Sequence, residues 1–209
     1  MRNRTKTDEA EKRPRGRPRA YEPEVVLRQA MDLFWKAGYS GTSLDDIAAA
    51  TGVNRPSLRA AFGDKHAIYL KALGDYWERK FETMRETLKD GRALDETLMS
   101  VYDAALSIYF SGGGRARGCF VVGTAVTEAV DDAEIRGSIS EGFRRLDANF
   151  EARLRLAHES GELKGGADPE ALALLATATM HSIAIRARAG TSRNDLRKFA
   201  LKAVSVICG

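Results

Sequence analysis

The sequence predicts an all-α protein of about nine helices. Apolar residues recur at helical spacing in one segment after another, and no segment alternates apolar with polar residues as a strand does. Glycines and helix-capping residues separate these segments. The 209 residues are 44% hydrophobic, which is enough for a core. No apolar run is long enough to cross a membrane, so we expect no membrane partner.

Positive charge is concentrated at the N-terminus. Residues 1–20 contain eight Arg or Lys and three Asp or Glu, so this segment carries +5 in a chain of net charge +4 at pH 7. The rest of the chain therefore sums to −1. Because residues 1–20 have almost no apolar side chains, we expect a disordered basic arm with a nucleic-acid partner.

Three arginines of this arm, Arg15, Arg17 and Arg19, stand in the run RGRPR. Arginines on a flexible backbone can enter a narrow A·T-rich minor groove, where the negative potential is deepest. The run also resembles the AT-hook element. The alternative is a solvated basic tail that only raises nonspecific affinity for DNA.

The first predicted helix covers residues 24–37 and ends at Gly38. Its inward-facing residues are Val26, Leu27, Ala30, Leu33, Phe34 and Ala37. Two short helices follow within residues 44–65. Ser43 is placed to cap the first, with Asp46 completing a capping box, and Gly52 ends it because glycine adopts left-handed geometry without strain. Asn54 caps the second.

The second short helix, residues 54–62, points Leu58 and Phe62 into the core. Its opposite face carries Arg55, Ser57, Arg59 and Ala60. A helix of under three turns has no hydrophobic reason to be presented this way. Insertion into a DNA major groove provides one.

Further helices are expected at residues 64–89, 94–110, 119–130, 135–159, 168–189 and 192–207. The segment 119–130 is almost uncharged, which favours a central position. The last two helices are so apolar that we expect them to pack against a second copy of the chain.

Residues from about Ala20 to Tyr76 resemble the DNA-binding domain of the TetR family of bacterial transcriptional repressors. The segments EVVLRQAMDLFWKAGY, TSLDDIAAATGV and NRPSLRAAFGDK carry the resemblance, and Lys65 then opens a long helix. RGRPR and RGCFVVGTAVTEA resemble one branch of the family. After the arm at 1–20, the resemblance implies a helix-turn-helix domain at 21–66 and a helical ligand-sensing and dimerisation domain at 67–209.

The resemblance also implies a function. It is that of a cytoplasmic homodimer that binds a palindromic operator in double-stranded DNA and is released by a small-molecule or electrophile inducer. It implies no enzymatic activity. Two alternatives remain: an architectural binder of A·T-rich DNA without an inducer, and an enzyme that uses Cys119 as its nucleophile.

Arg55 is the predicted base-reading side chain, because a guanidinium presents two parallel donors to O6 and N7 of guanine. At position 59 the family usually has Tyr, whereas Arg59 would bind phosphate more strongly. By the family pattern, the base contacts also include Asp45, Pro56 and Ala60, and the phosphate contacts are Ser43, Ser57, Arg59 and Lys65. The complete predicted DNA-binding set is Arg15, Arg17, Arg19, Ser43, Asp45, Asn54, Arg55, Pro56, Ser57, Arg59, Ala60 and Lys65.

A cavity between helices is the usual small-molecule site in a bundle. The residues expected to line it are Trp77, Phe81, Tyr102, Leu106, Tyr109, Cys119, Val122, Met180 and His181, and plain core packing is the alternative for each of them. By the family pattern, the dimer interface is expected to include Leu172, Leu175, Thr179, Ile183, Leu196, Phe199 and Val204.

Cys119 and Cys208 are the two cysteines, and their spacing fits neither a disulfide framework nor a zinc site. We therefore expect no metal and no cofactor. Cys119 begins a predicted helix, with Arg115 and Arg117 just before it, and both features favour a reactive thiolate that senses electrophiles or oxidants. The alternative is a small buried residue.

Overall fold

The computed structural model describes residues 21–89 and 91–209, and these residues contain helices and no strand. The predicted all-α fold is confirmed. The basic arm, with Arg15, Arg17 and Arg19, lies outside the described residues. The helices are α1 (Pro23–Ala37), α2 (Leu44–Thr51), α3 (Arg55–Phe62), α4 (Lys65–Leu88), α5 (Leu94–Tyr109), the π-helical turn η1 (Val121–Ala125), the 3-10 turn η2 (Glu128–Val130), α6 (Ala133–Glu159), α7 (Pro169–Arg188) and α8 (Arg193–Cys208).

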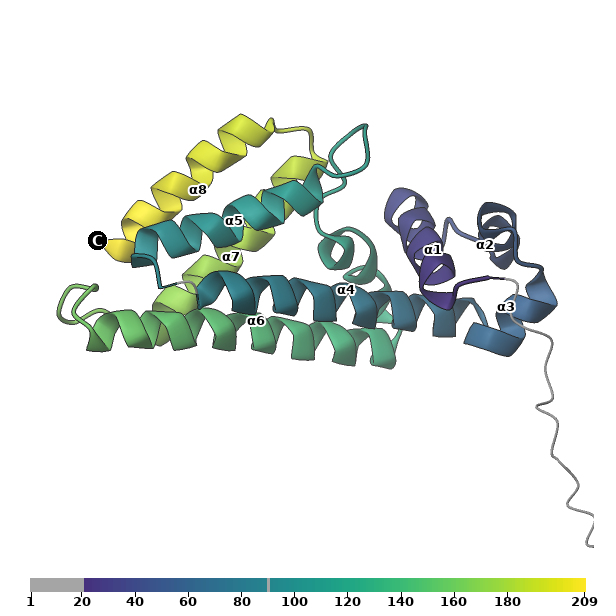
Figure 1. The fold of residues 1–209 in the computed structure, drawn as a ribbon, viewed down its shortest axis with the longest axis horizontal. Helices are drawn as coiled ribbons and strands as arrows, with labels where there is room; N and C mark the ends of the chain where they lie inside the picture. Colours follow the sequence, from purple (N-terminus) through teal and green to yellow (C-terminus); the bar gives the residue numbers. More distant parts are fainter. Residues whose placement is uncertain (1–20, 90) are drawn as a thin grey trace, which may run out of the picture.

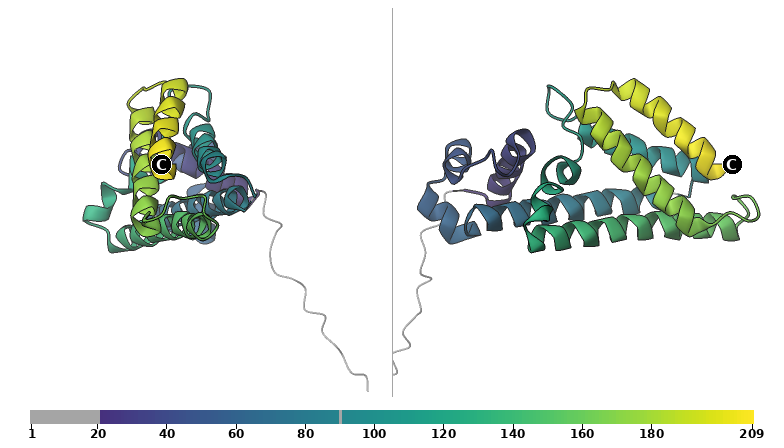
Figure 2. Two further views of the ribbon diagram at one scale, coloured as in Figure 1. Left: turned by 90° about the vertical axis from the view of Figure 1, so that its left-hand side faces the viewer. Right: turned by 180° about the vertical axis from the view of Figure 1, so that it is seen from behind.

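The helices form a small unit and a larger one that share α4. Helices α1, α2 and α3 sit at one end of α4, and α6 runs beside most of its length (Figure 1). Helices α5, α7 and α8 pack together over the other end (Figure 2). In the reverse view, the turns η1 and η2 lie between α1 and this larger group. A helix of 24 residues, α4, therefore connects the two units.

Side-chain caps begin most of these helices where the sequence predicts them. Asp64 accepts a hydrogen bond from the Ala67 amide at 2.9 Å and begins α4. Asp168 begins α7 and is followed by Pro169 in the first turn. Ser192 accepts from the Asp195 amide at 3.1 Å and begins α8. These local caps therefore determine at which residue each of these helices begins, independently of how the helices pack.

The close pairing of α4 with α6 depends on Gly142. A Cβ atom added at this position would lie 2.2 Å from the Trp77 ring, so no larger residue fits without displacing the indole. Trp77 in turn stacks on Phe81 with ring centroids 5.3 Å apart. The absence of one side chain thus allows the two long helices to approach.

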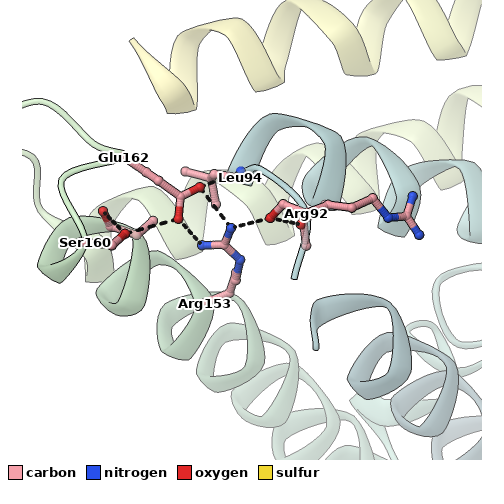
Figure 3. A network of polar contacts seen from close by, with 7 residues as sticks. Arg92, Leu94, Arg153, Ser160 and Glu162 are labelled. Carbon is pink, nitrogen blue, oxygen red and sulfur yellow. Dashed lines mark hydrogen bonds and ion pairs between the residues drawn. The ribbon is translucent and has the colours of Figure 1, made fainter. Parts of the chain in front are cut away.

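An ion pair between buried Arg153 and exposed Glu162 fixes the far end of the bundle (Figure 3). Arg153 on α6 donates to both carboxylate oxygens of Glu162, at 3.3 and 3.1 Å, and to the Arg92 carbonyl at 3.1 Å. Glu162 also accepts from the Leu94 amide at 2.8 Å, which caps α5. The hydrogen bonds from Arg153 are the main cause that lowers the pKa of Glu162. This network connects the start of α5 to the end of α6.

The prediction of a regular helix at 119–130 is wrong. The segment is a π-helical turn followed by a 3-10 turn, because side chains from elsewhere take part in its hydrogen bonding. Thr124 donates to the Phe120 carbonyl at 2.8 Å and is bonded to the Tyr69 hydroxyl at 2.7 Å. Arg136 donates to the carbonyls of Ala129 and Val130 at 2.6 and 3.0 Å, where the 3-10 turn ends.

The inner face of α1 is wider than predicted. Met31 and Trp35 are buried in addition to Val26, Ala30 and Phe34, whereas Ala37 is exposed. The reason is that α1 contacts α2 on one side and both α4 and η1 on the other. Trp35 faces η1, a contact that the spacing of apolar residues within α1 cannot reveal.

The predicted dimer interface needs correction. Thr179, Ile183, Leu196 and Val204 are buried inside the chain's own core and are not available to a second copy. Leu172 and Phe199 are half-buried, and Leu175 is exposed. The large apolar side chains that α7 and α8 do expose are Leu174, Leu175, Ile185, Leu201 and Val206. No helix of the described residues is long and apolar enough to cross a membrane.

Candidate functional site

Helices α2 and α3 are joined by a tight turn, and both begin with a side-chain cap. The Ser43 hydroxyl accepts from the Asp46 amide at 3.1 Å, while the Asp46 carboxylate accepts from the Ser43 amide at 2.8 Å and forms the predicted capping box. Gly52 ends α2 in the left-handed conformation, with φ of 67°. Asn54 then accepts from the Ser57 amide at 2.9 Å and begins α3.

One face of α3 is buried and the other is presented to solvent, as predicted. Leu58 and Phe62 are buried, and α3 packs against α2. Arg55, Pro56, Arg59 and Ala60 are exposed, as is Asn54, and Ser57 is half-buried. The structure thus brings the predicted contact residues of α3 together on one outward surface.

An exposed ion pair joins α2 to α3 on this surface. Arg55 Nη1 lies 3.2 Å from Asp45 Oδ1, and the two side chains are 52% and 70% exposed. The carboxylate therefore orients the predicted base-reading guanidinium across the turn. Within the part of the chain that the structure describes, the other guanidinium nitrogens have no partner and can donate to a base edge.

Lys65 is engaged differently from the other predicted phosphate contacts. Its ammonium group donates to the Tyr39 carbonyl at 3.1 Å and lies over the Tyr39 ring, 4.1 Å from the centroid. The hydroxyl of Ser43 is likewise used, because it donates to Asp46 Oδ2 at 2.6 Å. Arg59 makes no ion pair with any described residue. Two positively charged residues were predicted to contact phosphate. Lys65 is engaged by Tyr39, so Arg59 is the one whose charge is available to phosphate in this conformation.

Trp35 connects the small unit with the larger one. Its indole N–H donates to the Arg117 carbonyl at 3.3 Å, and the Arg117 guanidinium lies over the indole ring, 4.4 Å from the centroid. Arg117 also forms an ion pair with Asp32 at 2.7 Å. On its other side Trp35 meets the Tyr76 ring edge-on at 5.4 Å and lies 5.5 Å from the Phe120 ring. Sequence reasoning missed this contact.

Cys119 lies in a buried polar cluster behind Trp35. Its sulfur accepts from the Tyr76 hydroxyl at 3.2 Å, and the Tyr109 phenol interacts electrostatically with it. Burial is the main cause that raises the pKa values of both phenols. Tyr109 in turn accepts from the Lys80 ammonium at 3.5 Å. Lys80, Tyr109, Cys119 and Tyr76 thus form a continuous chain of polar contacts.

This environment corrects the predicted surroundings of Cys119. The residue is only 3% exposed, and no regular α-helix begins there. Arg117 is engaged with Asp32 and Trp35, and Arg115 lies in the exposed loop. The two arginines that prompted the thiolate hypothesis therefore do not pair with the sulfur. The neighbours of Cys119 are phenols and, beyond Tyr109, a lysine.

The predicted cavity-lining residues are mostly core. Trp77, Phe81, Tyr102, Leu106 and Tyr109 are buried, and the Tyr102 hydroxyl donates to the Ala176 carbonyl at 3.0 Å. Val122 is half-buried and lines a separate, open groove with Ile185. His181 is half-buried, and its ring lies 4.5 Å from that of Phe143.

A cavity of about 20 Å³ does exist between α4, α5 and α7, and Met180 of the predicted set borders it. Its lining residues are Lys80, Thr83, Met84, Thr87, Val101, Ala104, Ala105, Ile108 and Met180. Lys80 is the residue that sequence reasoning missed. A signal was present, because Lys80 falls between Trp77 and Met84 at helical spacing on the buried face of α4. Among the described residues, no three His, Cys, Asp or Glu side chains gather as metal ligands would.

Comparison with known proteins assigns a family. Residues 26–72 match the family model of bacterial regulatory proteins, tetR family, and residues 93–202 match that of the tetracyclin repressor-like C-terminal domain. The chain belongs to the TetR family. As a TetR-family protein it is a DNA-binding transcriptional regulator, and α2 and α3 form its helix-turn-helix.

Relatives and solved structures agree with this assignment. The HTH-type transcriptional repressor ComR of Escherichia coli K12 is 28% identical over 196 residues, which is 94% of this chain and 93% of ComR. The TetR-family regulator CifR, solved as a cysteine variant on 26-bp double-stranded operator DNA, is 28% identical with a TM-score of 0.82, covering 91% of this chain and 98% of that one. The reduced form of E. coli NemR has the same fold at 21% identity, with a TM-score of 0.78 and coverage of 89% and 96%.

Proposed function

We propose that this TetR-family protein is a homodimeric repressor that reads a palindromic operator with α3 and is released by a small-molecule or electrophile inducer. The observation that carries the proposal is the outward face of α3, which presents Arg55 and Arg59 on a helix held by buried Leu58 and Phe62. A recognition helix of this kind enters the major groove, and the two helices of a dimer enter successive grooves about 34–36 Å apart.

Base reading rests on Arg55 in this proposal. Its guanidinium lies next to Asp45, which holds it across the turn. A bidentate contact to guanine is worth about 1–3 kcal/mol of discrimination against other bases. Arg59 contacts phosphate, and Pro56 and Ala60 offer small apolar surfaces to thymine methyl groups.

Dimerisation rests on α7 and α8. These helices expose Leu174, Leu175, Ile185, Leu201 and Val206, although they also bury a full apolar face within the chain. Apolar side chains of this size grouped on two neighbouring helices support an interface between copies. CifR and ComR are both named as regulators, and CifR was solved on operator DNA, which further supports the operator-binding role.

Induction rests on the contact between Trp35 and Tyr76. A ligand or an adduct that disturbs the cluster around Cys119 would move Tyr76, and Tyr76 packs directly on α1 through Trp35. An effector shifts the protein from its DNA-binding state only by its different affinity for the two states. Through the contact between Tyr76 and Trp35, a change at the effector site would reach α1 and, through it, the recognition helix α3.

The experiment is selection of bound duplexes from a random DNA pool with the wild type and with Arg55→Ala. We expect a palindrome for the wild type, and a loss of preference for guanine at one position of each half-site for the variant. Arg144→Ala, which removes an exposed arginine of α6 far from α3, is the control and should recover the wild-type palindrome. Enrichment of A·T-rich DNA without a dyad would favour the architectural alternative.

A further inference from the structure

Lys80 is a lysine in the interior of the larger unit. Its side chain on α4 is 8% exposed, and no carboxylate of residues 21–89 or 91–209 lies within ion-pair distance of its ammonium group. The acceptor that these residues offer is the Tyr109 hydroxyl, at a long 3.5 Å. An ammonium group has three donors, so the described residues leave most of its hydrogen-bonding capacity unused.

Burial of a cation without a counter-ion is unfavourable. Taking an ammonium ion out of water costs several kcal/mol unless an anion and further hydrogen bonds compensate for it. Burial accordingly lowers the pKa of Lys80. An anion bound beside Lys80 would supply the counter-ion that the ammonium group lacks among the described residues.

Lys80 borders the cavity between α4, α5 and α7. The other walls are mainly apolar, with Met84, Val101, Ile108 and Met180 among them. A single cation on an apolar wall fits a ligand with one negative charge and a hydrocarbon body. Phosphate groups, with their higher charge, are bound by several donors or by arginines, and no arginine is among the described residues that line this cavity.

Next to Met180, which lines the cavity, stands a polar group without a partner among the described residues. His181 Nε2 is buried and has no hydrogen-bond partner among the described residues. Burial first, and then the positive charge of Lys80, lower the pKa of this imidazole to about 4, so the ring is neutral at pH 7. A neutral imidazole is able to donate to a ligand oxygen or accept from a ligand hydroxyl.

We propose that this cavity is the inducer site and that Lys80 selects an organic monocarboxylate with a compact apolar body. The proposal deepens the function above and rests on its premise that an effector acts on this part of the molecule. The carboxylate pairs with the Lys80 ammonium, and the hydrocarbon part enters between Val101, Met84 and Met180.

The free state has no room for such a molecule. A volume of about 20 Å³ holds roughly one water, so the ligand must separate α4 from α5 and α7. The carboxylate also replaces Tyr109 as the partner of Lys80. Tyr109 interacts with Cys119, and Cys119 accepts a hydrogen bond from Tyr76, so the exchange loosens the cluster that supports Trp35.

The test measures binding to the full chain without DNA. Sodium benzoate, 4-phenylbutyrate and octanoate are titrated by calorimetry, each beside its methyl ester. We expect at least one acid to bind one site per chain with an affinity at least about tenfold above that of its ester, the size of one charge-assisted contact. Lys80→Met should abolish that preference, and Lys71→Met, which removes an exposed lysine from the same helix, should keep it.

Failure of the carboxylate site can be distinguished from failure of the repressor function, because binding and operator release are measured separately. Lack of saturable binding by all three acids, or an unchanged preference in both Lys80→Met and Lys80→Gln, overturns the carboxylate site. Circular dichroism checks that each variant is folded. If Lys80→Met does not fold, Lys80→Gln alone provides the test. Operator release is measured separately. An acid that binds through Lys80 without releasing operator supports the site and contradicts its role in induction.

Discussion

Tyr76 donates its hydroxyl to the Cys119 sulfur at 3.2 Å, and its ring meets Trp35 of α1 edge-on. One side chain therefore touches both the buried polar cluster and the unit that carries the reading helix. The hydroxyl and the ring have separate roles, and substitutions can remove one and leave the other. The coupling between the two units can thus be tested at the level of single contacts.

Tyr76→Phe removes the hydroxyl and keeps the ring against Trp35. We expect a loss of about 1–2 kcal/mol in the free energy of unfolding, because the buried sulfur loses a donor. Operator affinity without effector should change little. Chemical denaturation and fluorescence anisotropy with labelled operator measure the two quantities. A large loss of operator affinity in a folded variant would contradict the separation of roles.

Arg117→Ala removes the guanidinium that stacks on Trp35 and pairs with Asp32. We expect faster hydrogen exchange in the second half of α1, while exchange in α8 stays unchanged, because local openings follow local contacts. Mass spectrometry of the exchanged peptides reads both regions. Arg193→Ala, which removes an arginine at the start of α8, is the control and should leave hydrogen exchange in α1 unchanged. Equal exchange in α1 for the wild type and Arg117→Ala would refute a bracing role for the arginine.

Asp45→Asn removes the negative charge beside Arg55. Because the pair is exposed, we expect the free energy of unfolding to change by less than about 1 kcal/mol. Affinity for nonspecific duplex DNA should rise, since a carboxylate no longer faces the phosphates, and the salt dependence should steepen. Anisotropy titrations at three salt concentrations give the slope. A slope equal to that of the wild type would indicate that Asp45 lies away from DNA.

Glu162 makes stability depend on pH. Its pKa is lower in the folded chain than its ordinary 4.5, mainly through the hydrogen bonds from Arg153, so the folded state favours the ionised form. This contribution is fully present above the unfolded pKa and is lost as the pH falls through the folded pKa. Denaturation of the wild type between pH 7 and pH 3 should show the loss. Arg153→Met should show a smaller dependence in the acid range and lower stability at pH 7.

Labelling distinguishes the two cysteines. Burial raises the pKa of the Cys208 thiol to about 11, and Cys119 is almost fully buried. We expect iodoacetamide to modify both slowly at pH 8 compared with a denatured control, since the thiolate is the reactive form. Cys208 should react faster as the pH approaches 11. Rapid labelling of Cys119 in the native protein at pH 8 would instead support the sensor hypothesis.

The sequence predicted what depends on neighbours along the chain. Ser43, Asn54 and Asp64 cap helices as expected, because a capping side chain bonds to amides two or three residues ahead. The outward face of α3 followed from the spacing of Leu58 and Phe62. The fold class and the polar surface of the reading helix were therefore predictable from local patterns alone.

What depends on distant residues was not predictable in this way. The irregular turns after Cys119 arise from Tyr69 on α4 and Arg136 on α6, which local patterns do not connect to that segment. Four of the seven residues predicted at the dimer interface lie in the chain's own core for a related reason. Two apolar helices in succession have an inner and an outer face, and only packing distinguishes Ile183, which is inside, from Ile185, which is outside.

The length of α4 sets a mechanical scale for the molecule. With 24 residues, it is about 36 Å long at a rise of roughly 1.5 Å per residue. A tilt of about 5° at one end of such a lever shifts the other end by about 3 Å, close to the rise of about 3.4 Å between neighbouring bases on one DNA strand. A tilt of α4 that small thus becomes a misalignment of about one base step at the operator.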